Sequence, residues 1–280
     1  MERTFFAMGT EWWLASDAAD AGLLQQAQAL VEDVEARLSR FRNESSLSCL
    51  NRDRTVDDAM LVEVLGAAEE ARVLTAGAFD ARAGSAVVAA GYDRSFELIA
   101  TPEGSAGDLQ RVFVAIQDTR VMLSGEGSVD LGGIAKGWTV DRVAALLAPA
   151  GPCIVDGGGD IAVRGGPAGG EWLIEAGDGL AVGLRDAAVA TSSSLRRRWR
   201  CTDGSVAHHI VNPGDGRPAL GVATAVVVAR STALADALAT ALVADISRTL
   251  PALVEVGADA LLQNADGRWE MTNGMERYLR

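Results

Sequence analysis

The segment VDLGGIAKGWTVD, from Val129 to Asp141, is the densest motif of the sequence and contains Lys136, the only lysine beside 24 arginines. Its glycines let the backbone pass close to a ligand. The apolar run from Trp138 to Leu147 continues as a helix, so Lys136 is expected near a helix start, where backbone N–H groups and the helix dipole favour an anion. A compact ammonium suits a phosphate there. The alternative is a strand-to-helix turn whose glycines are purely conformational; the motif is neither a Walker loop nor GxGxxG.

Composition indicates an ordinary globular protein. The chain has 280 residues, of which 49% are hydrophobic and 22% are charged. This is enough to bury a large core in one domain or in two tightly joined lobes. A net charge of −13 argues against a nucleic-acid partner, because phosphate backbones are bound by basic patches. The one cationic cluster, at 196–200, could hold a small anion or form a solvated turn.

Cysteine usage and hydropathy bear on the compartment. Cys49, Cys153 and Cys201 are odd in number and lack CxxC spacing, so we expect reduced thiols and neither a disulfide framework nor a zinc site. The N-terminus lacks a sustained apolar stretch before Glu11, and no later segment is an uninterrupted membrane-spanning run. With Met1 taken as the true start, the expected location is cytoplasmic and the chain is not expected to span a membrane.

Hydrophobic periodicity predicts mixed α and β structure. Thr4 to Leu14 has the pattern of one strand, apolar residues from Leu23 to Phe41 repeat at helical spacing, and a second helix is expected from Asp58 to Ala76. Short apolar runs between turns predict strands at Val112–Ile116, Arg120–Leu123, Cys153–Val155, Ile161–Arg164, Trp172–Ala176, Ala181–Leu184, His209–Val211 and Thr224–Val228. Many of the links are too short for crossover helices, so we expect antiparallel pairing.

A second glycine cluster, VDGGGDIAVRG, spans Val155 to Gly165. It has the pattern of a strand, a sharp turn and a second strand, with glycines that allow very close backbone packing, for instance against the first motif. A hairpin with unusual dihedral angles explains it as well as a ligand contact does. We assign it no catalytic role.

Two further patterns carry chemistry. Asp236 and Thr240 lie four residues apart in the alanine-rich segment STALADALATALVAD, so they share one face of a predicted helix with Ser231 as its N-cap. Their oxygens are ligands of the kind that magnesium accepts, although such a pair is usually only a polar stripe. His208 and His209 are the only histidines, and on a strand they would point to opposite faces. One of them could act as a base, or both could be structural.

Taken in order, these segments resemble the FAD:protein FMN transferase family, the ApbE-like flavin transferases. The resemblance runs from Met8 to about Leu242. It rests on MGT (Met8–Thr10), LSRFRNESSLSCLN (Leu38–Asn51), GAFDARAG (Gly77–Gly84), AAGYDRSF (Ala89–Phe96), LGGIAKGWTVD, VDGGGDIAVRG, ATSSS (Ala190–Ser194), HHIVNPGDGRP and ADALATAL.

The resemblance implies a magnesium-dependent enzyme that splits FAD at its pyrophosphate, attaches the FMN half to a threonine or serine of an acceptor flavoprotein, and releases AMP. It implies a compact α+β, T-fold-like architecture of mainly antiparallel sheets with packed helices, in which residues 1–280 form one domain with the flavin between two lobes. The implied FAD contacts are Met8, Phe41, Ala78, Phe79, Asp80, Asp130, Lys136 and the backbone near Ile210. The implied metal ligands are the Gly133 carbonyl, Asp236 and Thr240, and the implied catalytic residues are His209, Asp236 and Lys136.

The chain departs from the family pattern in three places. Many relatives carry an export signal or a lipid anchor that is not seen in this chain, which would require an acceptor on the cytoplasmic side. Asn212 stands where the family often has aspartate, and Ser193, Ser194 and Leu195 stand where it often has threonine, serine, glycine and an aromatic residue. Two other hypotheses remain open. The protein could be an FAD pyrophosphatase that uses water as the acceptor, or a non-catalytic protein that stores or delivers FAD.

Overall fold

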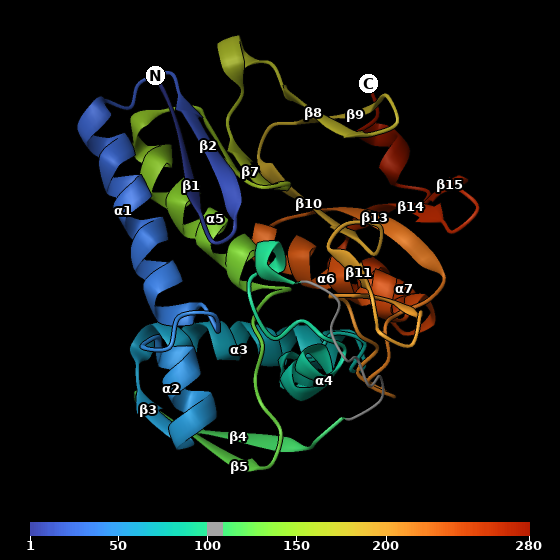
Figure 1. Cartoon of the computed structure of the whole chain (residues 1–280). Coiled ribbons are helices and arrows are strands. Elements are labelled where there is room, and N and C mark those ends of the chain that lie inside the picture. Colours follow the sequence, from blue (N-terminus) through green and yellow to red (C-terminus); the bar gives the residue numbers. More distant parts are fainter. Residues whose placement is uncertain (100–108) are drawn as a thin grey trace.

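The computed structural model describes residues 1–99 and 109–280. Its centre is an eight-stranded open sheet in the order β1-β2-β6-β7-β10-β13-β14-β15, and every neighbouring pair is antiparallel (Figure 1). The strands are β1 (Glu2–Ala7), β2 (Thr10–Ser16), β6 (Cys153–Gly157), β7 (Asp160–Arg164), β10 (Ala187–Ser193), β13 (Val222–Ala229), β14 (Asp259–Asn264) and β15 (Trp269–Met271). The predicted α+β class with antiparallel pairing is confirmed.

Both faces of this sheet are covered. Helices α1 (Ala21–Leu38), α5 (Ala135–Leu147), α6 (Thr232–Ala244) and α7 (Ile246–Val256) lie on one face, and the hairpin of β8 (Trp172–Gly177) and β9 (Leu180–Leu184) packs on the other. In β13, Ala225 and Val227 face α6 while Val226 and Val228 face the hairpin side. This two-sided burial explains the nearly continuous apolar sequence VATAVVVA, since no face of that strand meets solvent.

A smaller part lies beneath the large sheet in Figure 1. It contains α2 (Ser46–Asp53), α3 (Ala59–Leu74), α4 (Gly84–Ala89) and a three-stranded sheet of β3 (Thr55–Asp57), β5 (Arg120–Gly125) and β4 (Val112–Gln117). Helix α1 contributes to both cores, because Leu24 and Val31 pack with the large sheet and Val34 and Leu38 pack with the small part. The remaining hairpin joins β11 (Arg198–Arg200) to β12 (Val206–His208).

Several predicted elements need correction. The strand expected from Thr4 to Leu14 is two strands, because Met8 and Gly9 take φ values of 51° and 70° and reverse the chain. The first helix ends at Leu38 and does not reach Phe41. No strand covers 209–211, since β12 ends at His208 and Val211 makes only an isolated bridge. The glycine cluster does form a hairpin, with Gly158 and Gly159 at φ 74° and 95°.

Candidate active site

A cavity of about 830 Å³ lies where the small part meets the helices that cover the large sheet. It is lined by the β1–β2 turn, the residues after α1, the loop after α3, the start of α5, β10, the segment after β12, and α6. All twelve residues expected in the FAD, metal or catalytic sites line it: Met8, Phe41, Ala78, Phe79, Asp80, Asp130, Gly133, Lys136, His209, Ile210, Asp236 and Thr240. The fold thus brings residues from seven separate segments to one surface.

Lys136 is the second residue of α5 and forms an ion pair with Asp160, the first residue of β7. Asp160 is only 1% exposed. Burial lowers the pKa of the Lys136 ammonium, but the attraction of Asp160 and of Asp236 outweighs burial, so its pKa is raised. Lys136 is therefore positively charged throughout the physiological range.

Asp160, which pairs with Lys136 from behind the cavity wall, was not expected from the sequence. Because the glycines before it were explained by a hairpin, that segment received no catalytic role. The signal available in the sequence was an aspartate directly after three glycines and at the start of an otherwise apolar strand, where an unpartnered carboxylate would be costly to bury. Its partner, 24 residues earlier in the chain, could not be read from local spacing.

Glycines let the two helices that carry the polar groups approach each other closely. A Cβ added to Gly137 would lie 2.5 Å from the Thr232 carbonyl oxygen, and one added to Gly133 would lie 2.9 Å from Thr240 Oγ1. The start of α6 is capped from α5, since Asp141 accepts hydrogen bonds from the Thr232 and Ala233 amides at 2.8 and 2.9 Å. Ser231 is the N-cap residue of α6, as predicted, but its side chain makes no capping hydrogen bond.

Asp236 and Thr240 lie on the face of α6 that borders the cavity. Burial, reinforced by repulsion from Asp160, raises the pKa of Asp236 to about 7 even though Lys136 attracts the carboxylate and the Gly137 amide donates to it at 3.3 Å. The Thr240 hydroxyl lies 3.1 Å from the Ser192 hydroxyl of β10. The pair thus presents a poorly stabilised buried carboxylate and a hydroxyl side by side.

These donors fit a hard cation. Asp236, the Thr240 hydroxyl and the backbone at Gly133 are oxygen groups, which magnesium prefers, and magnesium usually takes few protein ligands and completes its shell with water and substrate phosphate. Over residues 1–99 and 109–280 there is no group of three or more His, Cys, Asp or Glu side chains that could hold a metal. Any cation here would complete its coordination with water or with oxygens of a ligand.

Aromatic rings and an arginine form another part of the cavity wall. The Phe41 and Tyr92 rings meet edge to face at 5.4 Å, and the Arg40 guanidinium lies over both rings at 4.2 and 4.7 Å. Arg40 also pairs with Asp130 at 2.5 Å and donates to the Tyr92 carbonyl at 2.6 Å. This wall offers flat apolar surface of the kind that stacks on a planar ring system. Arg40 and Tyr92 were not expected as site residues, since their contact spans 52 residues.

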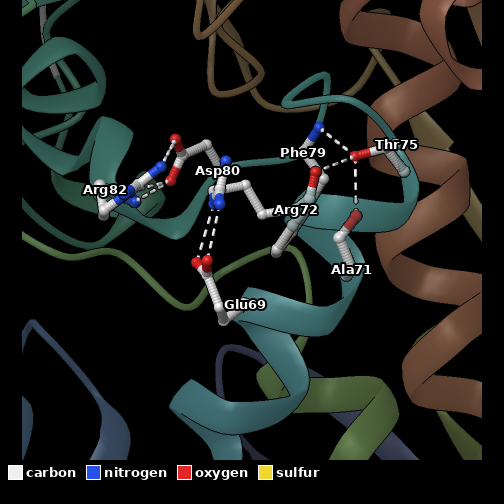
Figure 2. A network of polar contacts seen from close by, with 7 residues as sticks. All are labelled: Glu69, Ala71, Arg72, Thr75, Phe79, Asp80 and Arg82. Atoms are coloured by element: carbon white, nitrogen blue, oxygen red, sulfur yellow. Dashed lines mark hydrogen bonds and ion pairs between the residues drawn. The ribbon is translucent and has the colours of Figure 1, made fainter. Parts of the chain in front are cut away.

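The loop that carries Ala78, Phe79 and Asp80 is held by the end of α3 (Figure 2). The Thr75 hydroxyl donates to the Ala71 carbonyl at 2.8 Å and accepts from the Phe79 amide at 3.0 Å. The Asp80 carboxylate makes a two-bond ion pair with Arg82, both bonds at 2.8 Å. These contacts fix Phe79 at the cavity wall and neutralise Asp80.

The two histidines have different surroundings. His208 is buried, with Nε2 at 2.9 Å from the Ala219 carbonyl and Nδ1 accepting from the Ile210 amide at 3.3 Å. His209 lines the cavity beside Tyr92, and its buried Nδ1 has no hydrogen-bond partner among the described residues. Burial, together with the positive charges of Arg197 and Lys136, lowers the pKa of His209 to about 3. His209 is therefore a neutral imidazole.

Two residues of the cationic cluster, Arg196 and Arg197, also line the cavity, and Arg197 donates to the Gly9 carbonyl at 3.2 Å. One wall therefore suits a planar ring, while Lys136 and these arginines supply positive charge. A cavity of this size lies in the range of small-molecule sites. The fold and the site define an α+β protein whose large cavity suits a ligand with a planar ring and negative charge.

Comparison with known proteins identifies the family. The model of the ApbE family matches residues 8–262, so the chain belongs to the ApbE family. It is 31% identical over 252 residues to the FAD:protein FMN transferase of Vibrio cholerae, covering 80% of this chain and 74% of the relative. It is 29% identical to the enzyme of the same name from Treponema pallidum, covering 90% of this chain and 80% of the relative.

Solved structures agree with the fold. The ApbE protein from Thermotoga maritima superimposes with a TM-score of 0.88 at 26% identity, covering all of this chain and 99% of the other. The flavin transferase ApbE from Vibrio cholerae gives a TM-score of 0.76 at 24% identity over 99% and 98% of the two chains and supports the fold alone. The predictions of an ApbE-like fold and of an enzyme of this family are confirmed. No helix within the described ranges is long and apolar enough to cross a bilayer.

Proposed function

We propose that this protein transfers the FMN half of FAD to a threonine or serine hydroxyl of an acceptor flavoprotein, with magnesium, and releases AMP. One observation carries the proposal: a lone lysine, a buried carboxylate with a neighbouring hydroxyl, and a neutral histidine line the same cavity as an aromatic wall. Relatives whose names state this activity match most of the chain.

In the proposed reaction, the acceptor hydroxyl oxygen bonds to the phosphorus of the FMN half, and the bond from that phosphorus to the bridging oxygen breaks. AMP leaves with that oxygen, and the proton of the hydroxyl passes to His209. The Lys136 ammonium stabilises negative charge on the phosphate oxygens, which is the main requirement of phosphoryl transfer. Arg40, Phe41 and Tyr92 hold the flavin end.

His209 is a weak base while the cavity is empty, since burial and positive neighbours lower its pKa. The pyrophosphate of bound FAD brings negative charge next to Arg197 and Lys136, two of the groups that lower it. Substrate binding therefore raises the pKa of His209 toward the range in which a histidine accepts protons well.

The Gly133 carbonyl, Asp236 and Thr240 would hold the magnesium ion. When bound, magnesium neutralises phosphate charge and orients the phosphoryl group for displacement. A cation beside Asp236 also favours its ionised form, so proton and metal compete for this carboxylate.

The test is to incubate the purified protein with FAD, magnesium chloride and a candidate acceptor domain, and to measure the intact mass of the acceptor. We expect a mass gain of one FMN and stoichiometric AMP. An acceptor with its hydroxyl residue changed to alanine, and a reaction with EDTA, are the controls and should give no gain. Free FMN and AMP without a modified acceptor would indicate an FAD pyrophosphatase, and unchanged FAD would indicate binding alone; both results contradict transfer.

A further inference from the structure

We infer that Asp160 is a positioning residue that fixes the Lys136 ammonium for its role in flavin transfer, and this inference rests on the proposed function. Lys136 lines the cavity, with its side chain 19% exposed. Asp160 does not line the cavity, and its side chain is 1% exposed. Asp160 therefore has no direct contact with the cavity, and the cavity-lining side chain with which it pairs is Lys136.

The fold holds Asp160 rigidly. Gly158 and Gly159 take left-handed φ values that turn the chain from β6 into β7, and the Asp156 carboxylate accepts from the Gly159 amide at 2.8 Å. Asp160 then begins β7 opposite Ala190 of β10. Its backbone is thus fixed by a hairpin on one side and by a sheet ladder on the other.

Close packing brings this hairpin against α5, the helix of Lys136. A Cβ added to Gly157 would lie 2.9 Å from Val140 of α5 and 3.0 Å from the Trp12 ring, so only glycine allows the strand to approach so closely. The carboxylate and the ammonium therefore belong to two elements whose separation is set by backbone packing. This is the arrangement expected of a support that locks the rotamer of a functional side chain.

Pairing with Asp160 also keeps the Lys136 ammonium away from a second carboxylate, that of Asp236. Lys136 is attracted by both Asp160 and Asp236, yet across the described chain its only ion pair is with Asp160. A lysine has a flexible four-carbon stem, so without Asp160 its ammonium can turn toward Asp236. The pairing keeps the ammonium at one point and leaves Asp236 free for a cation.

A role in stability alone explains the pair less well. Buried ion pairs contribute little net stability compared with apolar residues of similar size, so a structural position of this kind does not require charges. The chain uses arginine at 24 other cationic positions and lysine only here. The buried Asp160 carboxylate therefore serves to hold the compact Lys136 ammonium at a fixed position in the cavity.

The first test is the substitution Asp160→Asn, which keeps the shape and removes the charge. We expect kcat for FMN transfer to fall by about 100-fold, as for a misplaced catalytic group, while KM for FAD changes little because the ammonium still attracts phosphate. The substitution Asp259→Asn is the matched control, since Asp259 is 8% exposed and pairs with Arg277 at 2.7 Å outside the cavity lining. It should lower thermal stability and leave kcat unchanged.

The second test combines Asp160→Asn with Lys136→Met. If Asp160 acts through Lys136, removing its charge in the Lys136→Met background should cause no further loss of activity. Independent, additive losses would overturn the inference, as would a single Asp160→Asn variant with the kcat of the native protein.

The third test does not depend on activity. Because Lys136 is the only lysine, lysine-selective isotope labelling gives one side-chain signal. We expect Asp160→Asn to move that signal and Asp259→Asn to leave it in place; an unmoved signal in Asp160→Asn would overturn the inference. If the native protein binds FAD but transfers no FMN, the proposed function fails, and the lysine signal still decides whether Asp160 positions Lys136.

Discussion

Around Lys136, charge is nearly balanced. One ammonium lies in the field of two buried carboxylates, Asp160 and Asp236, so the group carries one net negative charge when Asp236 is ionised and none when it is protonated. A proton cancels the excess, whereas a divalent cation leaves one net positive charge that a phosphate group can meet. Small changes in the size or charge of any of the three residues should therefore alter activity strongly.

The substitution Lys136→Arg tests the size of the cationic group, because it keeps the positive charge and changes the shape. The guanidinium is a wide planar fork, and Asp160 is buried with its backbone fixed on both sides. We expect FMN transfer to fall by at least about 10-fold, because the arginine cannot occupy the point of the ammonium without shifting its surroundings. Steady-state kinetics with FAD as the varied substrate measures the effect. An arginine variant with native kinetics would mean that compactness at residue 136 is irrelevant.

Asp236→Asn should stabilise the protein. The folded state raises the pKa of Asp236 to about 7, whereas an unfolded aspartate titrates near 3.9. Between these values the folded state holds a proton that the unfolded state has lost, so Asp236 makes stability fall as pH rises through this window and keeps it low above it. At about pH 7.5 we expect Asp236→Asn to raise the free energy of unfolding by about 1–3 kcal/mol, with little change at about pH 4.

The same variant tests the metal. Magnesium chloride should raise the melting temperature of the native protein at neutral pH, since ligands of the folded state stabilise it, and should leave that of Asp236→Asn unchanged. Asp236→Ala should lose magnesium-dependent turnover while keeping its fold. Equal stabilisation of native and variant proteins by magnesium would remove Asp236 from the metal site.

Substitution of the two histidines should have different effects on activity and stability. His209 lines the cavity and His208 is hydrogen-bonded within the fold, so His209→Ala should slow FMN transfer by about 100-fold or more with little effect on FAD binding. His208→Ala removes buried hydrogen bonds and should lower stability with a smaller effect on the rate. FAD binding by fluorescence and transfer by acceptor mass separate these outcomes. If His208→Ala slowed transfer more than His209→Ala did, His209 would not be the base.

Among the elements, α6 shows how far sequence patterns reach. Its alanine-rich helix with Asp236 and Thr240 on one face was predictable, because helical spacing and propensity are local. Its start after Ser231 was also predictable, but the side chain that caps it was not, because that side chain belongs to Asp141, 91 residues earlier. Two other features could not be predicted from local patterns either. In the β1–β2 turn, Met8 takes a left-handed conformation that its side chain does not favour. The partner of Asp160 lies on another element.

The N-terminal cap of α6 gives a prediction for Asp141 and Ser231. Asp141→Ala should destabilise the protein by about 1–2 kcal/mol, since two amides at the helix start lose their acceptor. Ser231→Ala should change stability by less than about 0.5 kcal/mol, because the Ser231 side chain makes no capping bond. Urea denaturation of both variants measures the difference. Equal losses would mean that Ser231 also caps the helix in solution.

For the whole molecule, the cavity lies where two cores meet, and the helices join those cores. Leu24 and Val31 of α1 pack with the large sheet while Leu38 packs with the small part, and α6 likewise contributes to two cores through Ala237 and Leu238. Movement of one core relative to the other would therefore bend or break helices that belong to both cores. We expect the cavity walls to be held in place by the same helices that carry the site.

This sharing of helices predicts one cooperative unfolding transition, in keeping with a single domain of two packed lobes. Leu14→Ala in the large-sheet core and Leu47→Ala in the small part remove side chains that are 0% and 1% exposed. Each should destabilise the protein by about 2–5 kcal/mol and shift the whole transition, as seen by circular dichroism and by tryptophan fluorescence alike. Saturating FAD should shift the same single transition upward in the native protein, because a ligand in the proposed site would contact both parts of the fold. Two separate transitions, with each variant moving only one of them, would establish independent domains and would mean that FAD binds at an interface that can open.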